Sequence, residues 1–416
     1  MTGYRSLFRT PEFTPLFLGS AAQTAAQTVG GLALATLVYR ATGSPLLSAV
    51  SMFGPSLAQV LGATVLLSGA DRLPPRTALS AIALVFAAGT AVQALPGLPV
   101  GAVFAVVLAL GLVASLGGGV RWGLLNEILT EQGTAENAYL PGRSLFNMMS
   151  GLMQIAGFAT GGVLLTTLSP RVCLLLSAAL YLAAALVLRL ALTARPPRTA
   201  GRPSAAATWR TNALLWSSRS RRLTYLGLWL PNGLVVGCES LYVSYAPHAA
   251  GTLFACGAFG MFAGDVTVGR LLPRAVRRRM ATPLLLLLAT PYLVFAAYPP
   301  LPVAMVCVTL ASAGFGASLV QQERLMELTP GELAGQALGL HSAGMLTLQG
   351  VSAALAGTVA QATSPAAGMT AMAAGSVLVT LALATAARRS PRPEPRRSEP
   401  AERAEPVARA ASAEAG

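Results

Sequence analysis

The sequence has no lysine and few charged residues of any kind: 11% of its 416 residues are Asp, Glu or Arg. Soluble domains carry about 25% charged residues, whereas 54% of this chain is hydrophobic. So little charge cannot cover a surface that faces water, which excludes an ordinary soluble protein. Lipid must therefore surround most of this chain.

Groups that carry enzyme chemistry are also scarce. The chain has two histidines, and its four cysteines lie in separate apolar runs without metal-ligand spacing. It contains no glycine-rich phosphate loop with lysine and no nucleophile motif in context. We therefore expect no enzyme activity, no metal and no cofactor. An ion gradient, or the gradient of a substrate itself, must drive any work that this protein does.

Apolar runs long enough to cross a bilayer recur along the chain. A spanning helix needs about 20 mainly apolar residues, and the sequence offers twelve such runs. The first follows Arg5 and Arg9 as a signal peptide would, but its length and its two glutamines favour a retained helix. The predicted spans are 14–38, 45–68, 77–95, 99–122, 144–168, 172–193, 223–245, 250–268, 280–298, 301–320, 336–361 and 365–386.

The arginines lie almost entirely on one side of this predicted topology. When the loops are assigned to alternate sides, 27 of the 29 arginines fall on one side, and only Arg40 and Arg171 fall on the other. The positive-inside rule then places both termini in the cytoplasm. This asymmetry explains the net charge of +14 without a nucleic-acid partner. Because the basic residues are all arginine and alanine and proline are abundant, we expect a bacterial inner (plasma) membrane.

Residues 194–222 interrupt the apolar pattern with Pro, Arg, Ser and Thr. They divide the chain into an N-terminal six-helix bundle at 1–193 and a C-terminal six-helix bundle at 223–386, joined by a cytoplasmic linker. Residues 387–416 lack apolar periodicity, so we expect a disordered cytoplasmic tail. The predicted fold is an all-α membrane protein with twelve transmembrane helices.

The two halves resemble each other, as expected of a transporter built from parallel repeats. Glu127 and Glu131, in the predicted loop after the fourth helix, recur 196 residues later as Glu323 and Glu327 after the tenth. The same displacement relates Gly161 to Gly357. The alternative is that acidic loops flanked by arginine resemble each other without a repeat.

The loop between the second and third predicted helices is the most specific feature of the chain. It contains Gly69, Asp71, Arg72 and Arg76, with Pro74 between them. From residue 5 to about 387 the chain resembles the major facilitator superfamily, whose loop at this place has a glycine, an aspartate, an arginine, a second glycine and further basic residues. Pro74 stands at the second glycine. The resemblance implies two bundles around a central cavity, and a loop that latches one conformation.

Gly157, Gly161 and Gly162 in the fifth predicted helix form a second motif. They resemble the glycine-rich antiporter motif of drug:proton antiporters within that superfamily, with Phe158 in place of a proline. Close packing of helices explains small residues at this spacing equally well. The overall sequence pattern of the chain is also similar to that of the macrolide-efflux-like branch of these antiporters.

Glu239 is the one acidic residue clearly inside a predicted span. An ionisable group in hydrocarbon is costly and is a functional candidate by default. Asn232 and Tyr242 lie seven residues before it and three after it, on the same helical face. We expect this face to line a cavity and Glu239 to carry the coupled proton. A structural hydrogen bond to a neighbouring helix is the alternative.

The remaining charged and polar candidates divide into two sets. The first is a cytoplasmic gate, in which Asp265 could bind Arg270 and the acidic residues could face basic loops. The second follows helical spacing on the first, fifth, seventh and eleventh helices, which line the cavity in the superfamily. The gate set is Gly69, Asp71, Arg72, Arg76, Glu127, Glu131, Asp265, Arg270, Glu323 and Glu327. The cavity set is Gln23, Gln27, Asn147, Gln154, Asn232, Tyr242, His341 and Gln349. Hydrogen bonds between helices would explain these amides as well.

The sequence thus predicts a monomeric secondary transporter in the lipid bilayer. Its partners would be protons and a small hydrophobic or amphipathic molecule, which it would export by alternating access. Two alternatives stay open. One is a metabolite importer or facilitator, which a denser ring of charges in the cavity would favour. The other is a membrane sensor or scaffold that keeps the fold without transport.

Overall fold

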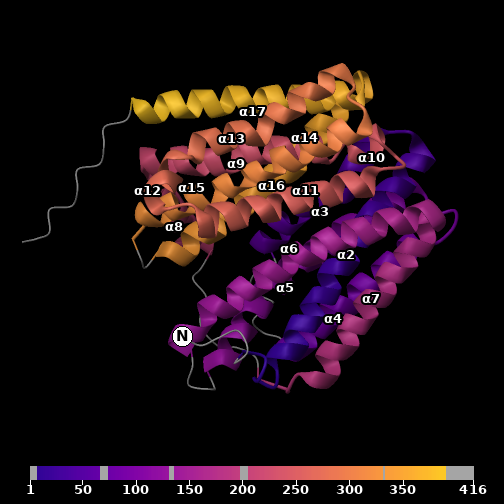
Figure 1. Ribbon diagram of the computed structural model, residues 1–416. Helices are drawn as coiled ribbons and strands as arrows, with labels where there is room; N and C mark the ends of the chain where they lie inside the picture. Colours follow the sequence, from indigo (N-terminus) through magenta and orange to yellow (C-terminus); the bar gives the residue numbers. More distant parts are fainter. Residues whose placement is uncertain (1–6, 66–73, 131–134, 197–204, 331–332, 390–416) are drawn as a thin grey trace, which may run out of the picture.

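The structure is a computed structural model that describes residues 7–65, 74–130, 135–196, 205–330 and 333–389. These residues form helices and connections, and no strand occurs among them. The helices gather into two bundles, seen in indigo to magenta and in pink to yellow in Figure 1. The predicted all-α fold is confirmed, and its arrangement in two bundles fits the predicted twelve helices.

The first bundle contains six helices joined by short connections. Its helices are α2 (Phe13–Thr42), α3 (Pro45–Val65), α4 (Pro75–Gln93), α5 (Val100–Thr130), α6 (Ala135–Thr167) and α7 (Pro170–Ala191). Their packing is most extensive between α2 and α7, where the hydroxyl of Ser177 donates to the carbonyl of Ala26 at 2.6 Å. Such small polar residues let helix backbones approach and supply hydrogen bonds where lipid cannot.

The second bundle has the same plan with more interruptions. Its helices are α9 (Arg219–Glu239), α10 (Tyr242–Tyr245), α11 (Ala250–Val266), η2 (Thr267–Leu271), α12 (Arg274–Arg279), α13 (Ala281–Ala289), η3 (Thr290–Ala297), α14 (Leu301–Ala313), η4 (Gly314–Gly316), α15 (Ala317–Glu327), α16 (Ala334–Ala362) and α17 (Pro365–Arg388). Several of these segments continue one another within a single span, as α14, η4 and α15 do.

Nine helices within the described residues are long and apolar enough to cross a membrane. The other three predicted spans correspond to α2, α9 and the pair α13 and η3. The first helical turns of α9 carry Arg219, Arg221 and Arg222, and the apolar segment Ala281–Ala297 is shorter than 18 residues. The arginines lower the mean hydropathy of α9, and the second segment is short, but both segments are helical. The nine spans and these three segments together fit the twelve-helix prediction.

Equivalent helices of the two bundles begin with the same device. Ser169 precedes Pro170 at the start of α7, and Ser364 precedes Pro365 at the start of α17. Each serine hydroxyl accepts a hydrogen bond from a backbone N–H three residues later, at 3.4 Å in α7 and 3.1 Å in α17. Serine caps the free N–H groups while proline suits the first helical position. This pair relates the two halves at a displacement of 195 residues.

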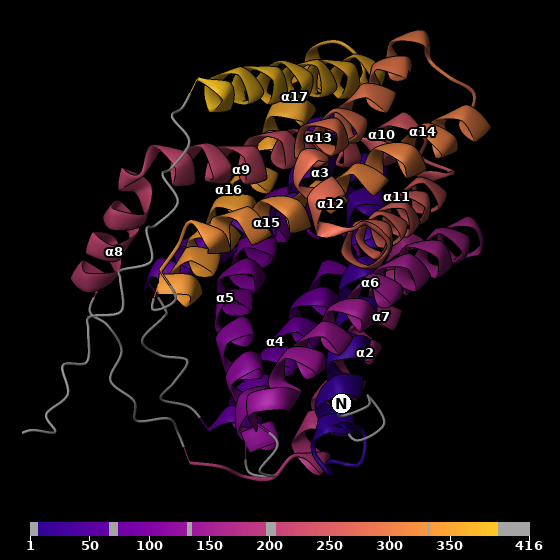
Figure 2. The same ribbon diagram turned by 60° about the vertical axis from the view of Figure 1, so that its left-hand side comes forward.

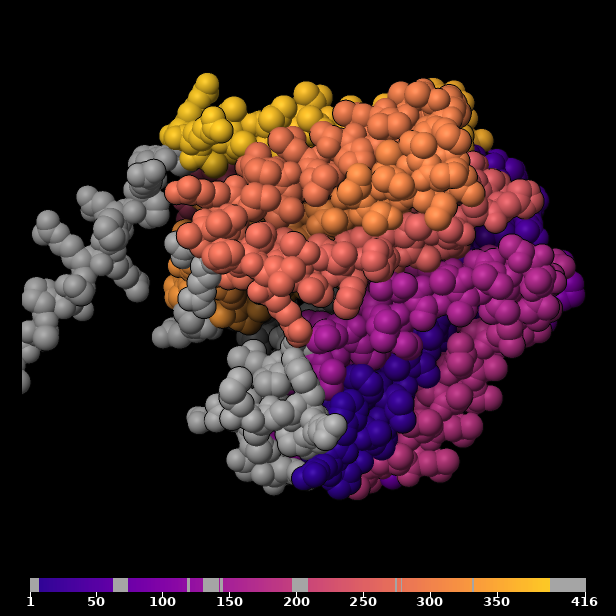
Figure 3. All heavy atoms as spheres, in the orientation of Figure 1, coloured from indigo at the N-terminus to yellow at the C-terminus, as the bar shows by residue number. Residues whose placement is uncertain are grey.

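Two ends of the molecule are named here for use below. The linker end is where α7 finishes, α9 begins and α17 finishes; the far end holds the connections at residues 43–44, 168–169, 246–249 and 363–364. In Figure 1 the far end lies on the right, and the bundles diverge from it toward the linker end. The space-filling view shows their side chains in contact along the far end (Figure 3).

The predicted linker contains a helix that the sequence pattern did not indicate. Helix α8 (Ala205–Ser217) leads directly into α9, which begins at Arg219, before the predicted end of the linker. Figure 2 shows α8 projecting from the end of α9. Trp216 of α8 stacks on Trp229 of α9, with ring centroids 5.5 Å apart and planes 10° apart. This aromatic contact fixes α8 to the second bundle. The predicted disordered tail begins too early, because α17 continues to Arg388, and the tail from residue 390 onward lies outside the described residues.

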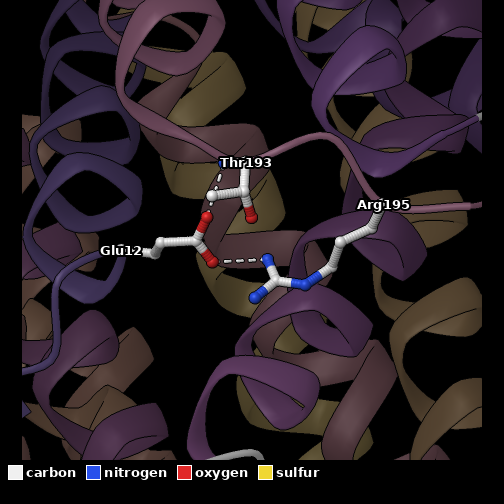
Figure 4. Close-up of polar contacts among 3 residues, drawn as sticks. All are labelled: Glu12, Thr193 and Arg195. Carbon is white, nitrogen blue, oxygen red and sulfur yellow. Dashed lines mark hydrogen bonds and ion pairs between the residues drawn. The ribbon is translucent and has the colours of Figure 1, made fainter.

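A buried ion pair ties the chain that leaves α7 to the start of α2 (Figure 4). Both carboxylate oxygens of Glu12 are used: one accepts from the backbone N–H of Thr193 and the other pairs with the guanidinium of Arg195, each at 2.5 Å. Burial alone would raise the pKa of Glu12, but the bonds from Thr193 and Arg195 outweigh it and hold this pKa below its ordinary value. The contact fixes where the first bundle releases the chain.

Candidate functional site: a central cavity with one carboxyl group

A cavity of about 540 Å³ lies between the two bundles. Helices from both bundles form its walls, including α2, α3 and α6 from the first and α9, α11 and α16 from the second. Its volume falls within the range of small-molecule sites, about 300–1,000 Å³.

Glu239 is the only ionisable acid or base that lines this cavity in the described part of the chain, if tyrosine is set aside. It is the last residue of α9, where the helix gives way to a turn before α10. No described residue forms an ion pair with it. The sequence prediction that Glu239 faces a cavity agrees with this position.

Tyr242 lies beside Glu239 and anchors the short helix α10. The hydroxyl of Tyr242 hydrogen-bonds to that of Tyr292 in η3, and both side chains are fully buried in the second bundle. Tyr242 also contacts Phe254 edge to face, with ring centroids 4.8 Å apart. Because the tyrosine is held on two sides, it gives the cavity a rigid wall next to the carboxyl group.

Neutral side chains make up the rest of the lining. Amides reach the cavity from five helices, aromatic rings lie between them and three methionines supply flexible apolar surface. The amides are Gln27, Gln59, Gln93, Gln154 and Gln349; the aromatic rings are Phe53, Phe86, Phe158, Tyr181, Tyr242, Phe254 and Phe315; the methionines are Met52, Met261 and Met345. Such a lining suits a molecule with a large apolar surface and a few polar groups.

Half of the predicted cavity set is found there. Gln27, Gln154, Tyr242 and Gln349 line the cavity, and Gln23, Asn147, Asn232 and His341 do not. The sequence did not single out Gln59 and Gln93. Each is a polar residue inside an apolar run, which was the available signal, but hydropathy alone does not show which face of a helix points inward.

Three of the four residues outside the cavity have specific contacts elsewhere, and the fourth is exposed. Gln23 accepts a hydrogen bond from the guanidinium of Arg121 at 2.6 Å, and Asn147 is exposed on α6. Asn232 is buried, and its amide nitrogen donates to the carbonyl of Leu228 in its own helix at 2.6 Å. His341 accepts from the indole N–H of Trp229 through its backbone carbonyl at 3.0 Å. Of the predicted face, Glu239 and Tyr242 line the cavity, whereas Asn232, two turns earlier in α9, is buried in the packing of the second bundle.

The predicted gate is described only in part. Gly69, Asp71, Arg72 and Glu131 lie outside the described residues, and Arg76 sits half-buried in the first turn of α4. The other acidic members lie on helices and not in loops as predicted: Glu127 on α5, Glu323 and Glu327 on α15. The reason is that both helices continue past their apolar runs.

One charged contact joins acidic and basic members of the second bundle. Glu323 pairs with Arg277 of α12, and two nitrogens of the guanidinium reach the two carboxylate oxygens at 3.0 Å each. Asp265 and Arg270 are both exposed and form no ion pair with a described residue. Arg270 reaches the first bundle instead, with a nitrogen 3.9 Å from the sulfur of Met148.

The glycines of the fifth predicted helix, now α6, serve two interfaces. A Cβ on Gly157 would collide with Thr28 of α2, within the first bundle, and one on Gly161 would make ordinary contacts with Val29. Gly162 instead meets Gly251 of α11 in the second bundle. A Cβ on Gly162 would lie 2.8 Å from the Cα of Gly251. The backbones of the two bundles thus touch at this point near the far end.

Further contacts close the far end around this glycine pair. The hydroxyl of Tyr39 donates to the carbonyl of Ser244 at 3.5 Å. The hydroxyl of Ser44 donates to the side-chain oxygen of Gln361 at 2.7 Å. Both contacts join the first bundle to the second, so the two bundles are held together at the far end in this conformation.

The comparisons with known proteins agree with this architecture. Residues 223–414, which include the second bundle except the first turn of α9, match the model of the Major Facilitator Superfamily. No curated protein sequence matches the chain.

Solved transporters have the same fold over nearly the whole chain. A crystal structure of a mutant of the nucleoside transporter NupG superposes with a TM-score of 0.73 and 14% sequence identity, covering 90% of this chain and 99% of that one. A POT family transporter in complex with a thioalcohol-conjugated peptide gives a TM-score of 0.69 and 11% identity, covering 90% and 96%. The chain therefore has the fold of Major Facilitator Superfamily transporters.

Proposed function

We propose that this protein is a secondary transporter that exports a small hydrophobic or amphipathic molecule in exchange for protons, by alternating access. The observation that carries the proposal is the position of Glu239, the only carboxyl group among the described residues that line a cavity between both bundles. A buried carboxyl group without a cation can change its charge only with a proton or with a charged ligand. Glu239 is thus the proton-coupling residue.

The neutral lining supports the substrate class. Aromatic rings, methionines and amides surround the carboxyl group, and no arginine or histidine lines the cavity within the described residues. Phosphorylated or strongly anionic molecules would lack a counter-charge there. A molecule of mainly apolar surface gains affinity from burial, and the amides orient its few polar groups.

The two bundles support alternating access. In the present conformation Gly162 and Gly251, together with the Tyr39 and Ser44 contacts, close the far end. We place the linker end in the cytoplasm of a bacterium, because 27 of the 29 arginines lie on that side of the predicted topology. The cavity would then exchange its contents with the cytoplasm in one state and with the outside in the other. The gate residues on α5 and α15, and Arg277 of α12, which pairs with Glu323, belong to the cytoplasmic side.

Transport into everted membrane vesicles tests this proposal. Uphill accumulation of a fluorescent hydrophobic compound should follow an imposed pH gradient, acidic inside, and should be lost in Glu239→Gln. Thr358→Val, a polar change at an exposed position outside the cavity whose hydroxyl bonds only to the carbonyl of Ala354 in its own helix, is the control and should keep accumulation. Movement that ignores the gradient would favour the metabolite facilitator, and no movement of any compound would favour the sensor; either result would contradict the proposal.

A further inference from the structure

A second cavity lies wholly inside the second bundle, at its linker end. Its volume is about 280 Å³, and α9, α13, α15 and α17 form its walls. It shares no lining residue with the central cavity, and no described residue of the first bundle reaches it. It is therefore a separate chamber and not a branch of the proposed transport path.

Two buried polar side chains face this chamber with unused hydrogen-bonding atoms. Gln321 is 8% exposed and Thr380 is 2% exposed. The side-chain oxygen of each has no hydrogen-bond partner among the described residues. Native proteins rarely leave such atoms unsatisfied. Two of them in the same chamber point to a group that donates or accepts hydrogen bonds there.

The first bundle shows that this fold can fill the same place with apolar side chains. The displacement of 196 residues that relates Glu323 to Glu127 pairs Gln321 with Leu125, which is 0% exposed. The displacement of 195 residues between the serine caps of α17 and α7 pairs Thr380 with Ala185, which is 2% exposed. The second bundle thus replaces an apolar core with two polar side chains. Packing alone gives no reason for that replacement.

The charge distribution of the chamber restricts its ligand. The buried part is uncharged: Gln321, Thr380 and Thr224 supply polar atoms there, and Gly227 leaves room, since a Cβ on it would lie 2.7 Å from the amide oxygen of Gln321. The walls are aliphatic, with Leu223, Leu285, Val320 and Leu383.

Charged groups lie only toward the surface in this lining. Arg324 and Glu327 are exposed, and Glu323 is held by Arg277. A charged head group in the buried part would be desolvated without a counter-ion, which is costly. A hydroxyl or a carboxamide, in contrast, can both donate to Gln321 and bond with Thr380.

From this geometry we infer that the chamber is a second binding site, for a small uncharged molecule with a hydroxyl or carboxamide head and a short aliphatic body. The head bonds to Gln321 and Thr380, and the body lies against the four aliphatic side chains. Occupancy would brace α9, α15 and α17 against one another at the linker end, apart from the proposed transport path.

Four-carbon probes that differ only in their head group test the site. Saturation-transfer NMR on the purified full chain in nanodiscs would compare 1-butanol and butyramide with butylammonium and butyrate. The two neutral probes should give a saturable signal and the two charged probes none. Gln321→Leu or Thr380→Val should each weaken neutral-probe binding about 2- to 10-fold, the effect of losing one hydrogen bond. The double variant should lose the signal.

Two control variants separate binding from folding and from partition into lipid. Gln154→Leu, in the central cavity, should keep the signal, and Thr380→Ser should keep most of it because the hydroxyl remains. Saturable binding of a charged probe as tight as that of the neutral ones would overturn the inference. So would an unchanged signal in the double variant, or no saturable signal from either neutral probe in the wild type. If the double variant does not fold, the single variants decide.

Discussion

The glycine contact between α6 and α11 allows the effect of one substitution to be worked out from interatomic distances. A Cβ on Gly162 would lie 2.8 Å from the Cα of Gly251 and 3.2 Å from its carbonyl carbon. Carbon atoms in good contact are about 3.5–4.0 Å apart. The two helices must therefore separate locally by about 0.7–1.2 Å to reach that contact distance. Backbone atoms cannot rotate away as the end of a side chain could.

Gly162→Ala and the larger Gly162→Val should therefore weaken closure of the far end. Overpacking of this kind costs about 1–3 kcal/mol, which corresponds to about a 5- to 150-fold shift between two conformations at about 1.4 kcal/mol per tenfold. The population of the state with an open far end, relative to the closed state, should increase by that factor, since the bundles do not touch there in the open state. The neighbouring residue supplies the control. A Cβ on Gly161 meets its nearest atom at 3.5 Å, within the first bundle, so Gly161→Ala should shift nothing.

Spin labels on the two bundles measure this shift. Leu95 and Leu301 lie at the far end of the first and second bundles and are 53% and 40% exposed. After the four native cysteines are replaced, labels at these two positions should report longer distances in Gly162→Val than in the parent. An unchanged distance distribution in a folded Gly162→Val variant would refute the reasoning. The same lengthening in Gly161→Ala would also refute it.

Three further predictions concern contacts at the linker end. Because the pKa of Glu12 is held below its ordinary value, its ion pair with Arg195 stabilises the fold above about pH 4.5 and is lost as the pH falls through the folded pKa. Glu12→Gln should thus reduce the free energy of unfolding at pH 7 by about 1–3 kcal/mol and lower the melting temperature. The difference in melting temperature between wild type and variant should shrink in thermal unfolding at about pH 5, 4 and 3. A double-mutant cycle of Arg277→Gln and Glu323→Gln should give a coupling of about 1 kcal/mol in thermal unfolding, since the pair is bidentate but partly exposed; zero coupling would contradict the bidentate contact. Trp216→Ala should release α8 by removing its aromatic stacking, worth about 0.5–1.5 kcal/mol, which faster proteolysis between α7 and α9 would reveal.

The sequence predicted the helices better than it predicted their faces. Apolar length predicted the nine helices that are long and apolar enough to cross a membrane, and the structure also has a helix at α9, whose arginines and Glu239 lower its hydropathy. The end of α9 could not be read from the same pattern. The break after Glu239 depends on tertiary packing, in which Tyr242 bonds to Tyr292, fifty positions later in the chain. Asn232 shows a second limit: it shares a helical face with Glu239, but the cavity does not extend two turns along α9 to reach it.

The sequence indicated the carboxyl group of the candidate site more clearly than it indicated the amides. Glu239 stood out because charge is rare in lipid, and the structure places it in the central cavity. Gln59 and Gln93 gave a weaker signal, since an amide in a span either lines a cavity or bonds to another helix. Leu125 and Gln321 show the same limit inside the bundles. Only the folded chain reveals that one fills a core and the other faces a chamber.

The most direct test of proton coupling measures protons and substrate together. Purified protein is placed in liposomes that contain a pH-sensitive dye, and a transported compound is added outside. In an exchange, the compound leaves the outer solution and protons move from the liposome interior into that solution, which the dye reports as a rise in internal pH. Wild type should show proton movement that saturates with substrate, and Glu239→Gln should show none while still binding the compound. Proton movement of equal size in Glu239→Gln would contradict the central claim that this carboxyl group carries the coupled proton.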